Sequence, residues 1–128
     1  MNRGREVDVQ ALEHPRGWIM LRLRLAVEPR IFLRMTFMLN TGRPQSLIGA
    51  KTVAFLASLD MAEQLDGRRF RIRAPRTDDD ELLPDITVRL SAGPTLLGVD
   101  GMLGWDYLLQ FTEVRITPDA LRFAFVPR

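Results

Sequence analysis

The sequence predicts an all-β protein, a small closed β-barrel with one or two short helices. Two adjacent runs between residues 19 and 39 alternate large apolar side chains with other residues, which is the period of a strand with one buried face. Helical periodicity is confined to residues 49–65, at least in part, and 105–111. Shorter alternating runs lie at 69–73, 86–90, 113–117 and 121–126.

Composition indicates one ordinary globular domain. The chain has 128 residues, of which 46% are hydrophobic and 27% charged. It contains no cysteine, so disulfides and thiolate metal sites are excluded. Its apolar runs are too short to span a bilayer, and residues 1–6 lack the apolar stretch of a signal peptide. We therefore expect a cytoplasmic protein with no membrane partner.

The basic charge is mild and spread out. The net charge is +2, and 17 of the 18 basic residues are arginine, with Lys51 the exception. The only dense patch is Arg68 to Arg73, whereas a nucleic-acid surface needs more clustering and more exposed aromatics. We expect no nucleic-acid partner, although a β domain that binds RNA or DNA through its arginine-rich faces stays as a weaker alternative.

Residues 1–17 carry no clear period and include Pro15 and Gly17, so we expect an arm or a poorly ordered lead-in before a domain at 18–128. His14, the only histidine, has no partner constellation for a triad or a metal site. We interpret it as a surface residue.

The runs at 19–27 and 31–39 predict a hairpin, because Glu28-Pro29-Arg30 between them is a plausible turn. The second strand ends directly before Asn40. In the helical stretch that follows, Asp66-Gly67 marks an end or a turn. Two apolar rows are expected on this helix, one of Val53, Leu56 and Ala57 and one of Phe55, Leu59 and Ala62.

Beyond residue 73 the chain alternates between loops and short apolar segments. A loop is expected from Pro75 to Pro84. The segment from Thr95 to Leu103 should be a buried strand with close-packed backbone, because Gly98 and Gly101 lie within it. A terminal hairpin should turn at 118–120.

The stretch from Phe37 to Ile48 organises the rest of the chain. An apolar strand ends abruptly in a polar turn, whose tip holds the small side chains of Asn40 and Thr41. Gly42 gives the backbone freedom that a tight turn needs, and Pro44 stops continuation as a central strand. Taken alone, such a turn is ordinary.

Two stretches together resemble the motifs of retropepsin-like aspartic peptidases. The first, at 37–48, has aliphatics, Asn-Thr-Gly, and then a serine before two aliphatics; the second, at 99–108, has aliphatics and Gly104 before a short helix. They lie about 60 residues apart, in the order and spacing of one retropepsin-like subunit, and anchor roughly 18–128. The resemblance implies an acid-protease-type barrel that forms a homodimer, with interleaved terminal strands such as 121–126.

The resemblance also implies the site residues. Asn40 stands at the position of the catalytic Asp, with Thr41 and Gly42 completing the motif and Thr41 locking the two loops of the dimer together. We assign Arg43, Pro44, Leu103 and Gly104 to the binding of a peptide or protein substrate. The family's mechanism activates a water between two Asp at the dimer axis, so it needs no metal and no cofactor.

Asn40 removes this chemistry, because an amide cannot act as a general base at ordinary pH. We expect an aspartic endopeptidase scaffold that does not cleave peptides as written. Either Asn40 was engineered into a working enzyme, which its intact surroundings favour, or the chain is a natural pseudo-peptidase that binds peptides or dimerises.

The remaining acidic residues have simpler interpretations. Asp100 and Asp106 are expected to be a turn residue and a helix-start residue. The Asp78–Glu81 run reads as a solvated loop rather than a cation site. The flap that closes the cleft in this family would be either the Asp66-Gly67 turn or the Pro75–Pro84 loop. In the second case the acidic run would favour basic substrates.

Overall fold

The chain folds mostly into β-strands, as the sequence predicts. The computed structural model describes residues 6–13, 19–91, 98–117 and 122–128. The helices are α1 (Ala50–Ser58) and α2 (Trp105–Leu108). The strands are β1 (Val7–Glu13), β2 (Ile19–Glu28), β3 (Ile31–Leu39), β4 (Leu47–Ile48), β5 (Ala62–Gln64), β6 (Arg69–Ile72), β7 (Ile86–Leu90), β8 (Gly101–Leu103), β9 (Phe111–Thr117) and β10 (Arg122–Pro127).

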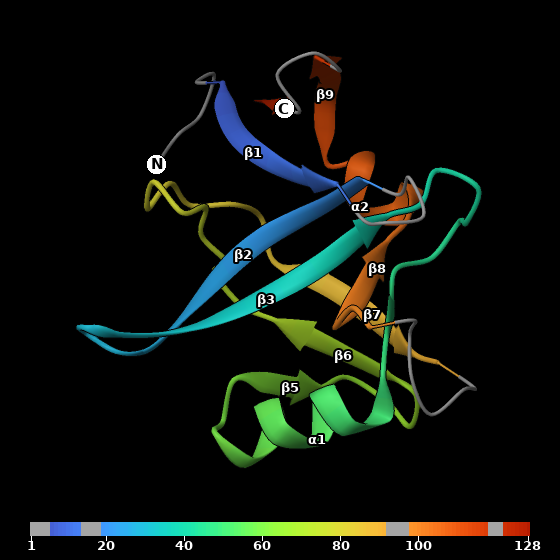
Figure 1. Cartoon of the computed structure of the whole chain (residues 1–128). Coiled ribbons are helices and arrows are strands. Elements are labelled where there is room, and N and C mark those ends of the chain that lie inside the picture. Colours follow the sequence, from blue (N-terminus) through green and yellow to red (C-terminus); the bar gives the residue numbers. More distant parts are fainter. Residues whose placement is uncertain (1–5, 14–18, 92–97, 118–121) are drawn as a thin grey trace.

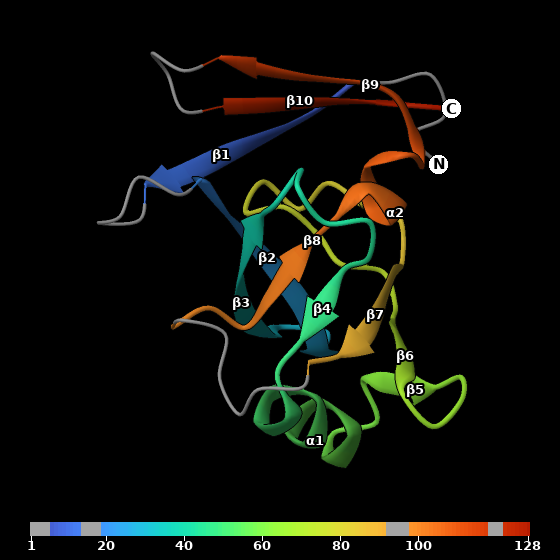
Figure 2. The ribbon, with the colours of Figure 1, turned by 90° about the vertical axis from the view of Figure 1, so that its right-hand side faces the viewer.

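The strands form one curled sheet in the order β5-β6-β7-β4-β8-β3-β2-β1-β10-β9 (Figures 1 and 2). Within the described residues, β5 and β9 are the two ends of this order, so the sheet is a half-barrel. Closure of the barrel stays a prediction. The core lies inside the curl, and its fully buried side chains include Phe37, Leu56, Ile72, Ile86 and Leu103.

The predicted hairpin of β2 and β3 is confirmed. The strands pair antiparallel from Met20 opposite Met38 to Leu25 opposite Leu33, and the register shifts near the turn. Leu21, a core residue of β2, is only 1% exposed, as the alternating pattern predicts. The longest hairpin of the molecule therefore carries the chain directly to Asn40.

Two short strands, β4 and β8, position the end of β3. Strand β8 lies between β3 and β4; it runs parallel to β3 and antiparallel to β4. Because parallel strands end at the same edge of a sheet, the residues after Leu39 and after Leu103 come together. Figure 2 shows β4 and β8 side by side, with the connection from β3 to β4 above them.

The N-terminal segment is a strand rather than an arm where the structure describes it. Strand β1 pairs antiparallel with both β10 and β2, and Val7 and Val9 are each 2% exposed. We expected an arm or a poorly ordered lead-in, but residues 7–13 are a paired strand. The short run is too weakly patterned to predict a strand, and its partner β10 lies at the far end of the chain.

The helical prediction for 49–65 was right for its first half only. Helix α1 ends at Ser58, Asp60 adopts a positive φ of 59°, and β5 follows. Val53 and Leu56 are buried as expected, whereas Ala57 is exposed. The second predicted row is not a buried face.

The remaining strand and turn predictions are mostly confirmed. Residues 66–67 turn between β5 and β6, α2 begins at Trp105, and β9 pairs antiparallel with β10. Of the segment predicted to be a strand up to Leu103, only β8 is a strand among its described residues. His14, Trp18, the segment 92–97 and the turn at 118–120 lie outside the described residues.

No helix in the described part of the chain has the length and apolar character needed to cross a membrane.

Candidate active site

The loop between β3 and β4 is a tight turn anchored at Asn40. The backbone N–H of Asn40 donates to the backbone carbonyl of Leu103 at 2.9 Å, which extends the pairing of β3 and β8 by one residue. The Arg43 N–H donates to the Asn40 carbonyl at 3.3 Å, and the Gly42 N–H donates to Asn40 Oδ1 at 3.0 Å. The side chain of Asn40 is thus held within its own turn.

The Asn40 side chain is half-buried above a small apolar cluster. Its Nδ2 lies 3.9 Å from the sulfur of Met102, which is a weak acceptor. Met102 packs with Met38, Leu47 and Val99 beneath the loop. Among the described residues, Asn40 Oδ1 therefore has a backbone donor, whereas Nδ2 has only the thioether of Met102.

A buried serine connects the loop to α2. Ser46 is 0% exposed; its hydroxyl donates to Asp106 Oδ1 at 2.6 Å and accepts from the Gly104 N–H at 2.9 Å. The Ser46 N–H lies 3.0 Å from both Asp106 carboxylate oxygens. The carboxylate and the hydroxyl together satisfy two backbone donors at the base of the loop.

Backbone hydrogen bonds complete this connection. The Trp105 N–H donates to the Arg43 carbonyl and the Asp106 N–H to the Pro44 carbonyl, each at 3.0 Å. Gly104 leaves no room for a side chain, because a Cβ there would lie 2.8 Å from the carbonyl oxygens of Arg43 and Gln45. The start of α2 and the loop therefore form one rigid unit.

The glycine before this unit is equally constrained. A Cβ at Gly101 would lie 2.6 Å from Cε2 of Phe37 and 2.7 Å from the Leu47 carbonyl. The close approach occurs because β8 is inserted between β3 and β4. The prediction of close-packed backbone is confirmed at this glycine.

The structure brings the predicted site residues to one end of the sheet but at different depths. Thr41, Gly42, Arg43 and Pro44 are exposed on the loop. Leu103 is fully buried and Gly104 is buried, and both support the loop from below. Catalytic and substrate-binding roles stay predictions, but the Leu103 side chain has no surface to offer a substrate.

Asp100 and Asp106 have structural roles. Asp100 Oδ2 accepts from the Thr36 N–H at 2.7 Å, and the Asp106 carboxylate binds Ser46. The preference for non-catalytic roles fits these contacts. The pairing of Ser46 with Asp106 was not anticipated, although each residue belongs to one of the two recognised motifs.

Two acidic side chains of the loop between β6 and β7 form ion pairs with arginines of β2. Asp78 Oδ2 lies 3.7 Å from Arg22 Nη1, and Asp80 Oδ1 lies 3.4 Å from Arg24 Nη2. Arg24 also exchanges two backbone hydrogen bonds with Arg76, at 2.8 and 2.9 Å. These contacts hold the loop against β2, so the suggestion that its charges select basic substrates is not supported.

The Asp66-Gly67 turn, which is the other flap candidate, lies away from Asn40. Strands β7 and β6 pair antiparallel, with Arg69 opposite Arg89 and Ile72 opposite Ile86. Arg89 N–H donates to the Ser46 carbonyl, so β7 passes Ser46 only near its C-terminal end. The turn at 66–67 joins β5 to β6. Figure 2 shows these two strands near α1, at the end of the sheet opposite to the loop between β3 and β4.

Within the described ranges, no group of three or more His, Cys, Asp or Glu side chains is arranged to hold a metal ion.

The fold resembles that of a solved peptidase. A crystal structure of a retropepsin-like aspartic protease from Rickettsia conorii superposes with a TM-score of 0.59 at 13% sequence identity. The match covers 96% of this chain and 92% of that protein. This chain has a retropepsin-like fold. At this identity the likeness is one of fold, and no protein-family model and no curated protein sequence matches the chain.

Strand β8 lies between β3 and β4 at the base of the loop that carries Asn40. In this arrangement the polar loop after β3 emerges at the end of two parallel strands, where backbone hydrogen bonds and the Ser46–Asp106 pair hold it. Residue 40 is therefore a polar side chain held in place at this edge.

Proposed function

We propose that this chain is one subunit of a homodimeric retropepsin-like aspartic endopeptidase scaffold, in a form without its catalytic carboxylate. The supporting observation is the position of Asn40, at the end of the central parallel pair and at the head of an intact turn. Thr41 is exposed beside it, where a second copy of the loop can reach. Two copies would place their residues 40 across a shared water.

An amide at position 40 makes both halves of such a dimer incompetent. In the two-carboxylate mechanism, one carboxylate removes a proton from water while the other, protonated, polarises the peptide carbonyl. Asn40 can donate or accept a hydrogen bond, but it cannot take the proton. We expect the chain to bind peptides in the shared cleft without hydrolysing them.

The local structure favours tolerance of a carboxylate at this position. Asp has the same shape as Asn, and its oxygen would keep the bond from the Gly42 N–H, strengthened by the charge. The substitution would remove the weak interaction between Nδ2 and the Met102 sulfur. Asn40→Asp should therefore fold and dock its loop as the present chain does.

The test is cleavage of a peptide library by Asn40→Asp at pH values from acid to neutral. The matched control is Gln45→Glu, which makes the same amide-to-carboxylate change on an exposed residue of the same loop. We expect cleavage by Asn40→Asp only. Peptides that carry a hydroxyl in place of the scissile amide should inhibit this cleavage. Mass spectrometry checks that residue 40 of the unchanged chain is still an amide. A folded Asn40→Asp variant without activity at any pH would reject the peptidase proposal.

The second candidate is a natural pseudo-peptidase that acts as a peptide-binding or dimerisation module. It is favoured by the Nδ2 group of Asn40, which lies 3.9 Å from the Met102 sulfur, because a carboxylate would lose this interaction. Tight peptide binding by the unchanged chain, together with no cleavage by Asn40→Asp, would select this candidate.

A further inference from the structure

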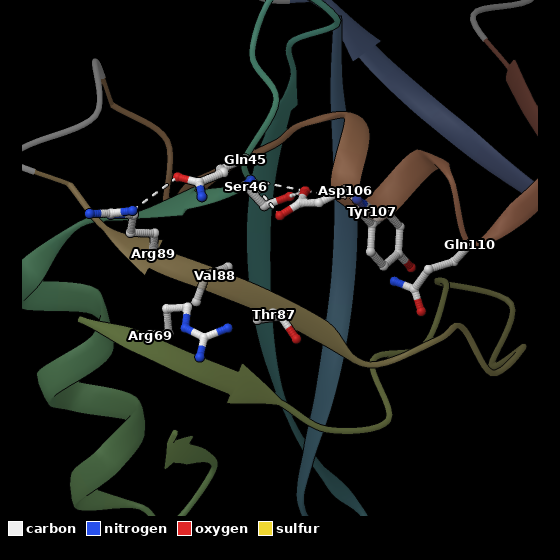
Figure 3. A pocket seen from close by; sticks show the side chains of 9 residues that line it. All are labelled: Gln45, Ser46, Arg69, Thr87, Val88, Arg89, Asp106, Tyr107 and Gln110. Carbon is white, nitrogen blue, oxygen red and sulfur yellow. Dashed lines mark hydrogen bonds between the residues drawn. The ribbon is translucent and has the colours of Figure 1, made fainter. Parts of the chain in front are cut away.

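A groove lies beside the base of the loop that carries Asn40. It has a volume of about 370 Å³ and is lined by residues of β6, β7, α2 and the end of the loop (Figure 3). The wall on the loop side is formed by Gln45 and by the Ser46–Asp106 pair. The groove is thus separate from Asn40 but shares the loop's base.

Two arginines face each other across its floor. Arg69 of β6 and Arg89 of β7 are directly opposite in the antiparallel register, and both are exposed. Directly opposite residues project from the same face of a sheet, and like charges in this position are destabilising. Both line the groove.

Arg69 has a carboxylate partner, whereas Arg89 has none among the described residues. Asp66 Oδ2 accepts from Arg69 Nε at 2.6 Å, which compensates the charge of Arg69. The Asp106 carboxylate also lines the groove; it accepts from the N–H and hydroxyl of Ser46 and from the Tyr107 N–H, and these neutral donors leave its negative charge in place. Within the described residues, the Arg89 guanidinium contacts only the neutral amide of Gln45, at 3.4 Å.

Two neutral polar side chains line the groove on the side of Arg89. These are Thr87, on the same strand, and Gln45, whose Oε1 accepts from the guanidinium (Figure 3). Gln110 lies across the groove from Arg89, and its Nε2 donates to the Asp85 carbonyl at 3.2 Å. The Tyr107 hydroxyl is engaged with the Pro84 carbonyl at 3.3 Å and is not counted as a donor. A guanidinium with adjacent amide and hydroxyl donors matches the geometry of a carboxylate or another oxyanion.

We propose that this groove binds the oxyanion group of a ligand, either a carboxylate on an acidic peptide or a small free anion, with Arg89 as its principal contact. The ligand would pair with Arg89 and displace Gln45 from it. This site does not depend on the peptidase function, because none of its contacts involves residue 40.

The experiment is a nuclear magnetic resonance titration of the full chain that follows the side-chain signals of Arg89 Nε and Gln45 Nε2. The probes are succinate, inorganic phosphate and a short Asp/Glu peptide, measured separately at constant ionic strength. We expect at least one probe to shift both signals saturably. Binding of the peptide alone identifies an acidic-peptide site, and binding of the small anions identifies a free-anion site.

Arg89→Ala should weaken the binding by roughly tenfold or more, because a hydrogen bond to a charged group is lost. Arg89→Lys should recover part of it, since the charge is kept without the planar fork. Arg34→Ala is the matched control, because Arg34 is exposed and also lies opposite an arginine, Arg24, but outside this groove. No saturable shift with any probe would overturn the proposal, as would equal affinity in folded Arg89→Ala.

Discussion

The hydroxyl of Ser46 donates to Asp106 at 2.6 Å across 60 positions of sequence, and it accepts from the Gly104 N–H at 2.9 Å. This contact joins the two stretches that carry the retropepsin resemblance. Because Ser46 is completely buried, removing its hydroxyl would take a hydrogen bond from both Asp106 and Gly104, and water could not easily replace these bonds.

Ser46→Ala should therefore lower the free energy of unfolding by about 1–3 kcal/mol, because the Gly104 N–H is left unpaired. Ser58→Ala is the control, since the Ser58 hydroxyl is exposed and bonds only the nearby Phe55 carbonyl. Urea unfolding measures both, and a double-mutant cycle with Asp106→Ala measures the coupling. Additive effects of Ser46→Ala and Asp106→Ala would mean that the pair does not act as a unit.

Gly101→Ala should be strongly destabilising, whereas Gly67→Ala should not. A Cβ at Gly101 would overlap the Phe37 ring and the Leu47 carbonyl, while a Cβ at Gly67 meets nothing within 4 Å. Overpacking of this kind costs about 1–3 kcal/mol or more, and a Gly-to-Ala change at an open turn is neutral or slightly stabilising. Thermal unfolding of the two variants compares them directly. Similar melting temperatures would show that β8 can move away from β3.

Tyr107 gives the protein a pH dependence in the alkaline range. Its ring is 2% exposed, and burial, followed by the charge of Asp85, raises the pKa of its hydroxyl above the usual value near 10. The folded state thus prefers the protonated phenol. Its contribution to stability is complete below pH 10 and is lost as the pH rises above the pKa of the unfolded chain.

Tyr107→Phe should remove most of this loss of stability at alkaline pH. The substitution also removes the weak hydrogen bond to the Pro84 carbonyl. Urea unfolding across neutral to alkaline pH compares the two proteins. Tyr107 is the only tyrosine, so the phenolate absorbance of the unchanged protein reports this residue alone. Titration of that absorbance near pH 10 in the folded protein would contradict the assignment.

The proposed dimer should respond to charge at position 40. Two Asn40 side chains at the axis avoid the repulsion that two carboxylates suffer, so the present chain should dimerise more tightly near neutral pH than Asn40→Asp. Lowering the pH should narrow the difference, because one carboxylate of each pair then takes up a proton. Sedimentation equilibrium measures both dissociation constants, with Gln45→Glu as the charge control. A looser dimer for the present chain contradicts the prediction.

The outer elements show what local pattern cannot predict. Residues 7–13 form a strand only because β10 and β2 lie on either side of them. The apolar row of Phe55 and Leu59 repeats with a helical period, yet both side chains are exposed because the core contacts only the opposite side of α1. Periodicity specifies which residues share a face, not which face is covered.

The sequence alone determined the β2–β3 hairpin, the glycines around β8 and the polar turn at Asn40, because alternation, turn chemistry and motif order are local properties of the chain. The tertiary structure brings Ser46 to Asp106, places Arg22 and Arg24 beside Asp78 and Asp80, and sets Arg69 opposite Arg89. Each of these is a contact between segments distant in sequence, and its existence depends on the order of strands in the sheet, which no local pattern encodes.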